Sequence, residues 1–339
     1  MSKQDWRKLD ESDVRVRPGK GTRPRSKRRP EHADAETAMV IGVDRGRWTC
    51  AMESGAVVTA MRARELGRTP VVVGDQVGIV GDTSGQPDTL ARIVRVEERT
   101  SVLRRTADDT DPFERVVVAN ASQLIMVVAL ADPPPRTGFI DRCLVAAYAG
   151  GLEPVLCLTK SDLASADSLL ALYTELDVPV IVTRFDEEPA ELRARLADTV
   201  SCLIGHSGVG KSTLVNRLVP DANRAVGVVS GVGKGRHTST QAVALRLPEG
   251  GWVVDTPGIR SFGLAHITPD DIVKAFPDFA EAAEECPPGC GHLGAPEDPG
   301  CMLDELVPDA PGRLTSLRRL LASRAGMDDY TDGAGTLPE

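Results

Sequence analysis

The stretch GHSGVGKS, residues 205–212, follows the apolar segment VSCLI and opens the helical pattern KSTLVNRLV. A glycine-rich loop between a strand and a helix is the context that a phosphate-binding P-loop requires. Such a loop binds a nucleoside triphosphate, but by itself it identifies neither the base nor the reaction. The rest of the chain has to supply both.

The residues of this loop have distinct expected roles. Gly205, Gly208 and Gly210 allow backbone amides to wrap the phosphates. Lys211 is expected to reach the outer phosphates, and the Ser212 hydroxyl to ligate magnesium. The candidate phosphate site also includes the neighbouring residues Ser207, Val209 and Thr213.

Downstream of the P-loop, the sequence carries candidates for two nucleotide switches. In WVVDTPG (252–258), Asp255 ends an apolar strand and can hold magnesium through water, and the Gly258 amide can sense a γ-phosphate. Between this segment and the P-loop, GKGRHTSTQ supplies the hydroxyls of Thr238, Ser239 and Thr240, one of which would complete the magnesium shell. We take Thr238 as the magnesium candidate.

Upstream of the P-loop, VLCLTKSD (155–162) is typical of the loop that reads guanine in GTPases. The Asp162 carboxylate can accept hydrogen bonds from guanine's N1 and exocyclic amine, which adenine lacks, and the Lys160 stem can pack over the ring. Together with Thr159, these residues form the candidate base-reading loop. It precedes the P-loop, whereas in an ordinary GTPase it follows, so we expect a GTPase whose segments are in rotated order.

Strand and helix patterns alternate from about 113 to 264, which predicts an α/β domain with a mainly parallel sheet and helices on both faces. Expected strands are 122–131, 154–160, 179–183, 200–205, 242–248 and 251–256, and expected helices are 139–150, 166–176, 189–197 and 211–219. Ligands then bind at the carboxyl ends of the strands.

Two further regions precede this domain. Five short strand patterns within 38–105 predict a small β-barrel, for which an OB-fold is the common case. Residues 1–36 are predicted to be a disordered basic arm. Residues 1–30 hold eleven Lys and Arg against four Asp and Glu, a charge of +7 in a chain of net charge −9. The arm is either a solubilising tail or a segment that lies along nucleic-acid phosphates.

The segment ECPPGCGHLGAPEDPGC brings Cys286, Cys290, His292 and Cys301 within sixteen residues. Three thiolates and one imidazole form a closed tetrahedral set, which suits one structural zinc ion. We expect a mainly helical zinc-binding domain over 265–325, followed by an acidic tail, 326–339.

Composition bounds the class of protein. The chain has 339 residues, of which 41% are hydrophobic and 26% charged, and no apolar run approaches the roughly 20 residues that a bilayer requires. No signal-peptide pattern opens the chain. We therefore expect a cytoplasmic protein without membrane association. We also expect a monomer. The remaining cysteines, in apolar segments, are expected to be buried: Cys50, Cys143, Cys157 and Cys202.

The rotated order resembles the circularly permuted GTPases of the ribosome small subunit-dependent GTPase A (RsgA) family over about 38–325. VVVGDQV, RTSVLRR, VANASQ and IDRCLV add to the resemblance. It implies an OB domain, a permuted GTPase domain and a zinc domain. It further implies binding of rRNA, with hydrolysis of GTP to GDP stimulated by the small ribosomal subunit during late maturation of that subunit. Thr159 departs from the family's usual Asn, which predicts a weaker or reorganised tie to the P-loop.

The water-orienting group is not obvious. Where a Ras-like enzyme places Gln after DTPG, this chain has Ile259, which cannot hold water. We take His237, in the first switch, as the catalytic candidate; the alternative is an exposed histidine that contacts RNA or nothing. Two other functions stay open. A P-loop ATPase or kinase would ignore Asp162, and a zinc-bearing nucleic-acid-binding regulator would leave Asp255 unexplained.

Overall fold

The computed structural model describes residues 32–106, 113–220, 222, 242–256, 263–306 and 311–326. Residues 34–339 form one compact unit. The predictions for the basic arm up to residue 31, for the acidic tail beyond 326, and for His237, Thr238 and Gly258 lie outside the described residues.

Five strands near the N-terminus close into a barrel, as predicted. They are β1 (Glu36–Asp44), β2 (Arg47–Met52), β3 (Val57–Arg62), β4 (Gln76–Gly81) and β5 (Ala91–Val96), with a 3-10 turn at Arg64–Leu66. Their order is β1-β2-β3-β5-β4, and β4 pairs with β1 to close the barrel. The β3–β5 pair is parallel and the others are antiparallel, which is the arrangement of an OB-fold. Val40, Cys50, Ala60, Val77 and Ile93 fill its interior with almost no exposure.

A tight joint follows the barrel. Strands β6 (Val102–Arg105) and β7 (Arg115–Ala119) form a two-stranded sheet that the sequence patterns did not predict. Gly74, in the barrel loop between β3 and β4, lies so close to this sheet that a Cβ would sit 1.9 Å from the Ala119 carbonyl oxygen. Asn120 donates to the Gly74 carbonyl at 2.9 Å. The VVVGD and VANAS motifs therefore meet where Gly74 contacts the Ala119 backbone, and only glycine fits at position 74 because of this contact.

The central sheet has the predicted α/β character. Its order is β10-β9-β8-β11-β13-β12, parallel except for β12. The strands are β8 (Gln123–Ala129), β9 (Glu153–Thr159), β10 (Val180–Val182), β11 (Val200–Ile204), β12 (Val243–Arg246) and β13 (Trp252–Asp255). The strands β8 and β9 are almost wholly apolar because helices cover both faces of the sheet.

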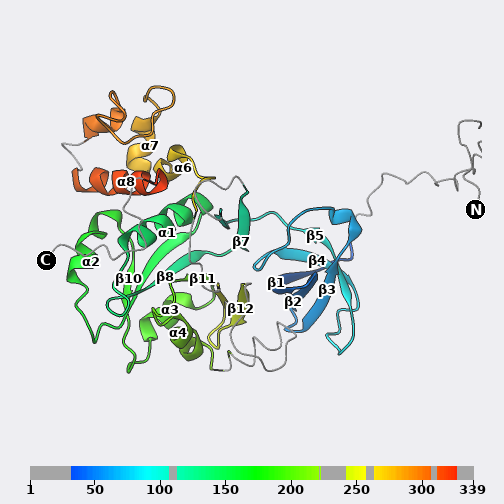
Figure 1. Cartoon of the computed structure of the whole chain (residues 1–339). Coiled ribbons are helices and arrows are strands. Elements are labelled where there is room, and N and C mark those ends of the chain that lie inside the picture. The colour runs from blue at the N-terminus through cyan, green and yellow to red at the C-terminus, as the bar shows by residue number, and fades with distance from the viewer. Residues whose placement is uncertain are drawn as a thin grey trace, which may run out of the picture. The chain divides into compact units, whose positions relative to one another are not determined.

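Four helices connect these strands: α1 (Thr137–Gly150), α2 (Asp167–Ala171), α3 (Ala190–Leu196) and α4 (Lys211–Leu218). In Figure 1, α1 lies on one face of the sheet, and α3 and α4 lie on the other. The helix expected over 166–176 is shorter than predicted. It ends at Ala171 and resumes as a 3-10 turn, η4 (Thr174–Leu176), where the Thr174 hydroxyl bonds the Leu170 carbonyl at 3.0 Å.

The C-terminal region is helical, as predicted. It comprises α6 (Pro269–Val273), α7 (Pro277–Ala283), the 3-10 turn η5 (Met302–Leu306) and α8 (Pro311–Arg324). A capping box between Thr268 and Asp271 begins α6. Helix α8 lies against α1 (Figure 1). Across the described part of the chain, none of the helices combines the length and the apolar character needed to span a bilayer.

Candidate functional site

Three parallel strands end at one edge of the central sheet, each next to a candidate site motif. Strands β8, β9, β11 and β13 run parallel, with Ala129 beside Thr159, Ile204 beside Met126 and Leu203 beside Asp255. Their carboxyl ends therefore lie together, and the segments that follow β9, β11 and β13 share that edge. The candidate base-reading loop follows β9, the P-loop follows β11, and the first two residues of the DTPG motif, Asp255 and Thr256, lie at the end of β13. These motifs are far apart in sequence.

The P-loop lies tightly against β8. A Cβ on Gly205 would sit 2.6 Å from the Val127 carbonyl oxygen, so this position requires glycine. Gly208 and Gly210 have φ values of +85° and +91°, a region that other residues rarely adopt. Gly210 then caps the N-terminus of α4. The backbone amides of this loop and helix end favour a bound anion.

Two polar contacts link the end of β13 with its neighbours, one to the P-loop and one to β11. The Lys211 ammonium, at 9% side-chain exposure, forms an ion pair with the Asp255 carboxylate. The Thr256 hydroxyl donates to the Leu203 carbonyl at 2.7 Å, which fixes the chain directly after Asp255. The expected phosphate-binding cation and magnesium-binding acid are thus neighbours. The Ser212 and Thr213 side chains are exposed at the start of α4.

The candidate base-reading loop is tied to the P-loop through Thr159. The Thr159 hydroxyl donates to the Val209 carbonyl at 2.6 Å and is itself buried. The sequence predicted a weaker or reorganised tie because Thr replaces the usual Asn. The hydroxyl takes over that connection by reaching the P-loop backbone directly.

Lys160 and Asp162 follow at the mouth of this loop. Lys160 has a φ of +57°, and its ammonium donates to the Asp132 carbonyl in the loop after β8. Asp162 is exposed, so its carboxylate is accessible to a ligand. The Ser161 hydroxyl donates to the Thr183 carbonyl at 3.3 Å, which links this loop to the one after β10.

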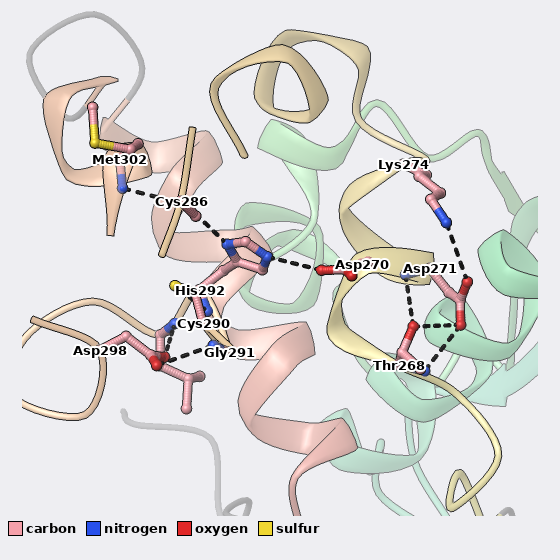
Figure 2. A network of polar contacts seen from close by, with 11 residues as sticks. Thr268, Asp270, Asp271, Lys274, Cys286, Cys290, Gly291, His292, Asp298 and Met302 are labelled. Atoms are coloured by element: carbon pink, nitrogen blue, oxygen red, sulfur yellow. Dashed lines mark hydrogen bonds and ion pairs between the residues drawn. The ribbon is translucent and has the colours of Figure 1, made fainter. Parts of the chain in front are cut away.

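A second cluster lies in the C-terminal region. The ligand atoms of Cys286, Cys290, His292 and Cys301 all lie within 4.8 Å of one another. These residues could hold one metal ion, and the S₃N donor set suits zinc. Figure 2 shows the His292 ring between Cys286 and Asp270.

Surrounding contacts orient the ligands of this cluster. The His292 Nδ1 atom faces the Cys286 sulfur at 3.5 Å, while Nε2 lies 3.1 Å from the Asp270 carboxylate. Such a carboxylate fixes the tautomer and orientation of a metal-binding histidine. Backbone amides of His292 and Met302 donate to the Cys290 and Cys286 sulfurs, both at 3.4 Å. Amide donors of this kind stabilise thiolates.

The Asp298 carboxylate shapes the loop that carries these ligands. It accepts hydrogen bonds from the Gly291 amide at 3.0 Å and the Leu293 amide at 2.9 Å (Figure 2). The bond from the Gly291 amide is the main cause that lowers the pKa of Asp298. The loop around His292 is therefore held by a carboxylate that stays ionised at neutral pH.

The other four cysteines are buried in the two hydrophobic cores. Burial raises the pKa of Cys50, Cys157 and Cys202 to about 12, and that of Cys143 well above its usual range. A neutral thiol is a poor metal ligand and a poor nucleophile. These residues are core packing, as expected.

The structure also adds contacts that the sequence reasoning missed. Asp132 and Asp270 are the partners of Lys160 and His292, and Thr256 anchors the segment after β13. Asp270 precedes His292 by 22 residues, and no local pattern marks the pairing. The apolar strand before Thr256 was the one signal that could have drawn attention to that residue.

Known proteins match this arrangement. A family model described as RsgA GTPase matches residues 96–265. A relative from Pseudomonas aeruginosa (strain LESB58), named Small ribosomal subunit biogenesis GTPase RsgA, is 37% identical over 271 residues, covering 76% of this chain and 77% of its own length. A relative of the same name from Gemmatimonas aurantiaca is 36% identical and covers 84% of this chain and 96% of its own length.

Two solved structures resemble the fold. YjeQ from Thermotoga maritima superposes with a TM-score of 0.63 and 27% identity, covering 86% of this chain and 99% of that one. YloQ, described as a circularly permuted GTPase, has a TM-score of 0.62 at 21% identity and supports the fold alone. Fold and loop order together define a P-loop GTPase of circularly permuted order. The chain belongs to the RsgA GTPase family.

Proposed function

We propose that this chain hydrolyses GTP to GDP and phosphate in late maturation of the small ribosomal subunit, and that the subunit stimulates the hydrolysis. The observation that carries the proposal is the meeting of the base-reading loop and the P-loop through Thr159 and Val209. The relatives named above carry small-subunit biogenesis in their names, which supports the cellular role.

Nucleotide binding is assigned to the three loops at the sheet edge. Amides of 205–210 and the Lys211 ammonium hold the phosphates. The Asp162 carboxylate selects guanine by accepting hydrogen bonds from N1 and the exocyclic amine. The Lys160 stem packs over the ring, and its bond to Asp132 supports that placement.

Magnesium is assigned to the hydroxyls of Ser212 and Thr238 and, through water, to Asp255. The accessible Ser212 hydroxyl and the closeness of Asp255 to Lys211 support this assignment. When bound with GTP, the ion neutralises charge on the phosphates. The Gly258 amide is assigned to the γ-phosphate.

The attacking water is assigned to His237, since Ile259 offers no group for it. Without an in-place glutamine, intrinsic hydrolysis is slow and a partner is needed to accelerate it. A His237→Ala variant that keeps its subunit-stimulated turnover near that of the unchanged protein rules this role out.

The C-terminal cluster is assigned to one structural zinc ion, because its four ligands leave no open coordination position. Binding to rRNA is assigned to the barrel and the basic arm, whose Lys and Arg side chains suit phosphates. We further propose that the protein is a cytoplasmic monomer.

The test measures phosphate release from GTP and from ATP, with and without purified small ribosomal subunits. The proposal expects slow release from GTP, strong acceleration by subunits and little release from ATP. Equal turnover of ATP points to a P-loop ATPase. Absence of acceleration removes the ribosomal role while leaving the GTPase activity in place.

A further inference from the structure

Helix α8 lies between the metal-binding cluster and the part of the central domain that surrounds the base-reading loop. It packs against α1 and α6 (Figure 1) and against the 3-10 turns η4 and η5. Its arginines contact two different regions. Arg318 contacts the loop that carries the candidate metal ligands, and Arg313 and Arg319 contact elements next to the base-reading loop.

One of these regions is the metal-binding loop. Arg318 donates to the His292 carbonyl at 3.4 Å and pairs with Asp304 in η5. The guanidinium also packs onto Gly294, where a Cβ would sit 2.5 Å from its Nη2. A side chain at position 294 would displace Arg318, so this close fit attaches α8 to the loop that carries the metal ligands.

The other region comprises α1 and the end of α2. The Arg319 Nε atom donates to the Asp141 carboxylate at 3.0 Å, and Nη1 donates to the Leu172 carbonyl at 3.0 Å. Its guanidinium lies 4.8 Å from the centre of the Tyr173 ring. The Asp141 side chain is 4% exposed, and a carboxylate buried to this degree depends on its cationic partner.

A second arginine reinforces this contact. Arg313 pairs with Asp177 at 3.0 Å and donates to the Glu175 carbonyl at 3.0 Å. A Cβ on Gly312 would lie 3.0 Å from the Glu175 side chain, so the start of α8 closely approaches η4. The segment 172–177 is thus held by α8 at both of its ends.

The elements that Arg319 holds are those that support the base-reading loop. Residues 163–177 connect that loop to β10, and α1 follows the loop in which the Asp132 carbonyl accepts the Lys160 ammonium. The Tyr173 hydroxyl donates to the Thr137 carbonyl at 3.3 Å, which joins the two supports to each other. Displacement of α8 would therefore act on both supports of the guanine-reading side.

We infer that α8 couples the zinc-binding loop to the guanine-reading side of the GTPase site, and that Arg319 is the positioning residue of this coupling. The inference rests on the proposed guanine and zinc sites. Arg319 keeps α1 and segment 172–177 in the arrangement that retains bound GDP or GTP. Its planar fork donates to Asp141 and to the Leu172 carbonyl from two separate nitrogens, a geometry that the single ammonium of a lysine reproduces only in part.

The test measures the dissociation rate of a fluorescent GDP analogue from the full chain, chased with unlabelled GDP, in zinc-loaded protein. Arg319→Met is expected to raise the rate about tenfold, within the range of typical coupling between sites. Arg319→Lys is expected to restore part of the retention. Arg92→Met, an exposed barrel position, is the matched control and should not change the rate.

Removal of zinc tests whether Arg319 transmits an effect of the zinc-binding loop to the nucleotide site or only stabilises that site locally. Chelation is expected to raise the GDP dissociation rate of the unchanged protein, but to add little in Arg319→Met, because the connection is already broken. A dissociation rate of Arg319→Met equal to that of the control overturns the inference. So does a full additional effect of chelation in the variant.

Folding must not obscure the result. If Arg319→Met fails to fold because the buried Asp141 carboxylate loses this cation, the double variant Asp141→Asn/Arg319→Met removes both charges and decides by the same criterion. A lowered melting temperature with an unchanged GDP dissociation rate shows a purely structural role and contradicts the inference. Failure of the unchanged protein to bind any guanine nucleotide instead refutes the proposed function.

Discussion

The Thr159 hydroxyl donates a hydrogen bond to the Val209 carbonyl at 2.6 Å. This bond joins the end of β9 to the P-loop, 50 residues later in the chain. It connects the loop assigned to the base with the loop assigned to the phosphates. The two loops can thus hold a nucleotide together even though their order in the sequence is reversed.

Replacing Thr159 with Val keeps the shape of the side chain and removes the donor. Since the Val209 carbonyl is then left without this partner, we expect GDP affinity to fall by about five- to tenfold, the equivalent of roughly 1 kcal/mol. Titration with a fluorescent GDP analogue measures it. Thr89→Val, which removes a similar hydroxyl-to-carbonyl bond in the barrel, is the control. Equal affinities in the two variants would show that the bond does not support binding.

Asp270 orients the imidazole of the metal-binding cluster. Replacing it with Asn removes the carboxylate 3.1 Å from His292 Nε2, and we expect zinc affinity to fall by about 10- to 100-fold. Competition with a chromogenic chelator measures the change. Glu284→Gln, an exposed carboxylate nearby, serves as the control and should bind zinc as the unchanged protein does. The orienting role is wrong if Asp270→Asn also keeps its full zinc affinity.

The buried Asp75 carboxylate supports the joint between the barrel and the rest of the chain. It is fully buried and pairs with Arg99 at 2.7 Å. Arg99→Met leaves this charge without its cation, so we expect the free energy of unfolding to fall by about 3–5 kcal/mol. Arg95→Met breaks the exposed Arg95–Glu97 pair and should cost less than about 1 kcal/mol. Denaturant unfolding compares the two, and equal costs would contradict the role given to Asp75.

Much of the fold could be predicted because local patterns determine it. The five barrel strands follow alternating apolar residues, and the central strands are continuous apolar runs between helices. Strand β6 pairs with β7, which begins ten residues after β6 ends, and the Gly74 loop of the barrel packs against β7. The sequence patterns within β6 and β7 indicate neither contact. The break between α2 and η4 arises where Thr174 bonds the Leu170 carbonyl.

The candidate sites likewise contain some residues that local sequence motifs reveal and others that only the fold brings together. Glycine spacing marked the P-loop, and cysteine spacing marked the metal cluster, because each motif is local. The partners Asp132, Asp270 and Arg319 are joined to their sites only by the fold. Arg319 lies 178 residues from Asp141, so sequence patterns could not have paired them.

The most direct measurement concerns the central claim, that a loop placed before the P-loop reads guanine through Asp162. Asp162→Asn replaces an acceptor-only carboxylate with an amide that can donate to the 2-oxo group of xanthine. We expect GTP affinity to fall by about 100-fold or more, since charge-assisted hydrogen bonds are lost, while XTP affinity rises. The matched control is Asp167→Asn, an exposed aspartate five residues later. A variant that still prefers GTP as strongly as the control does would contradict the account.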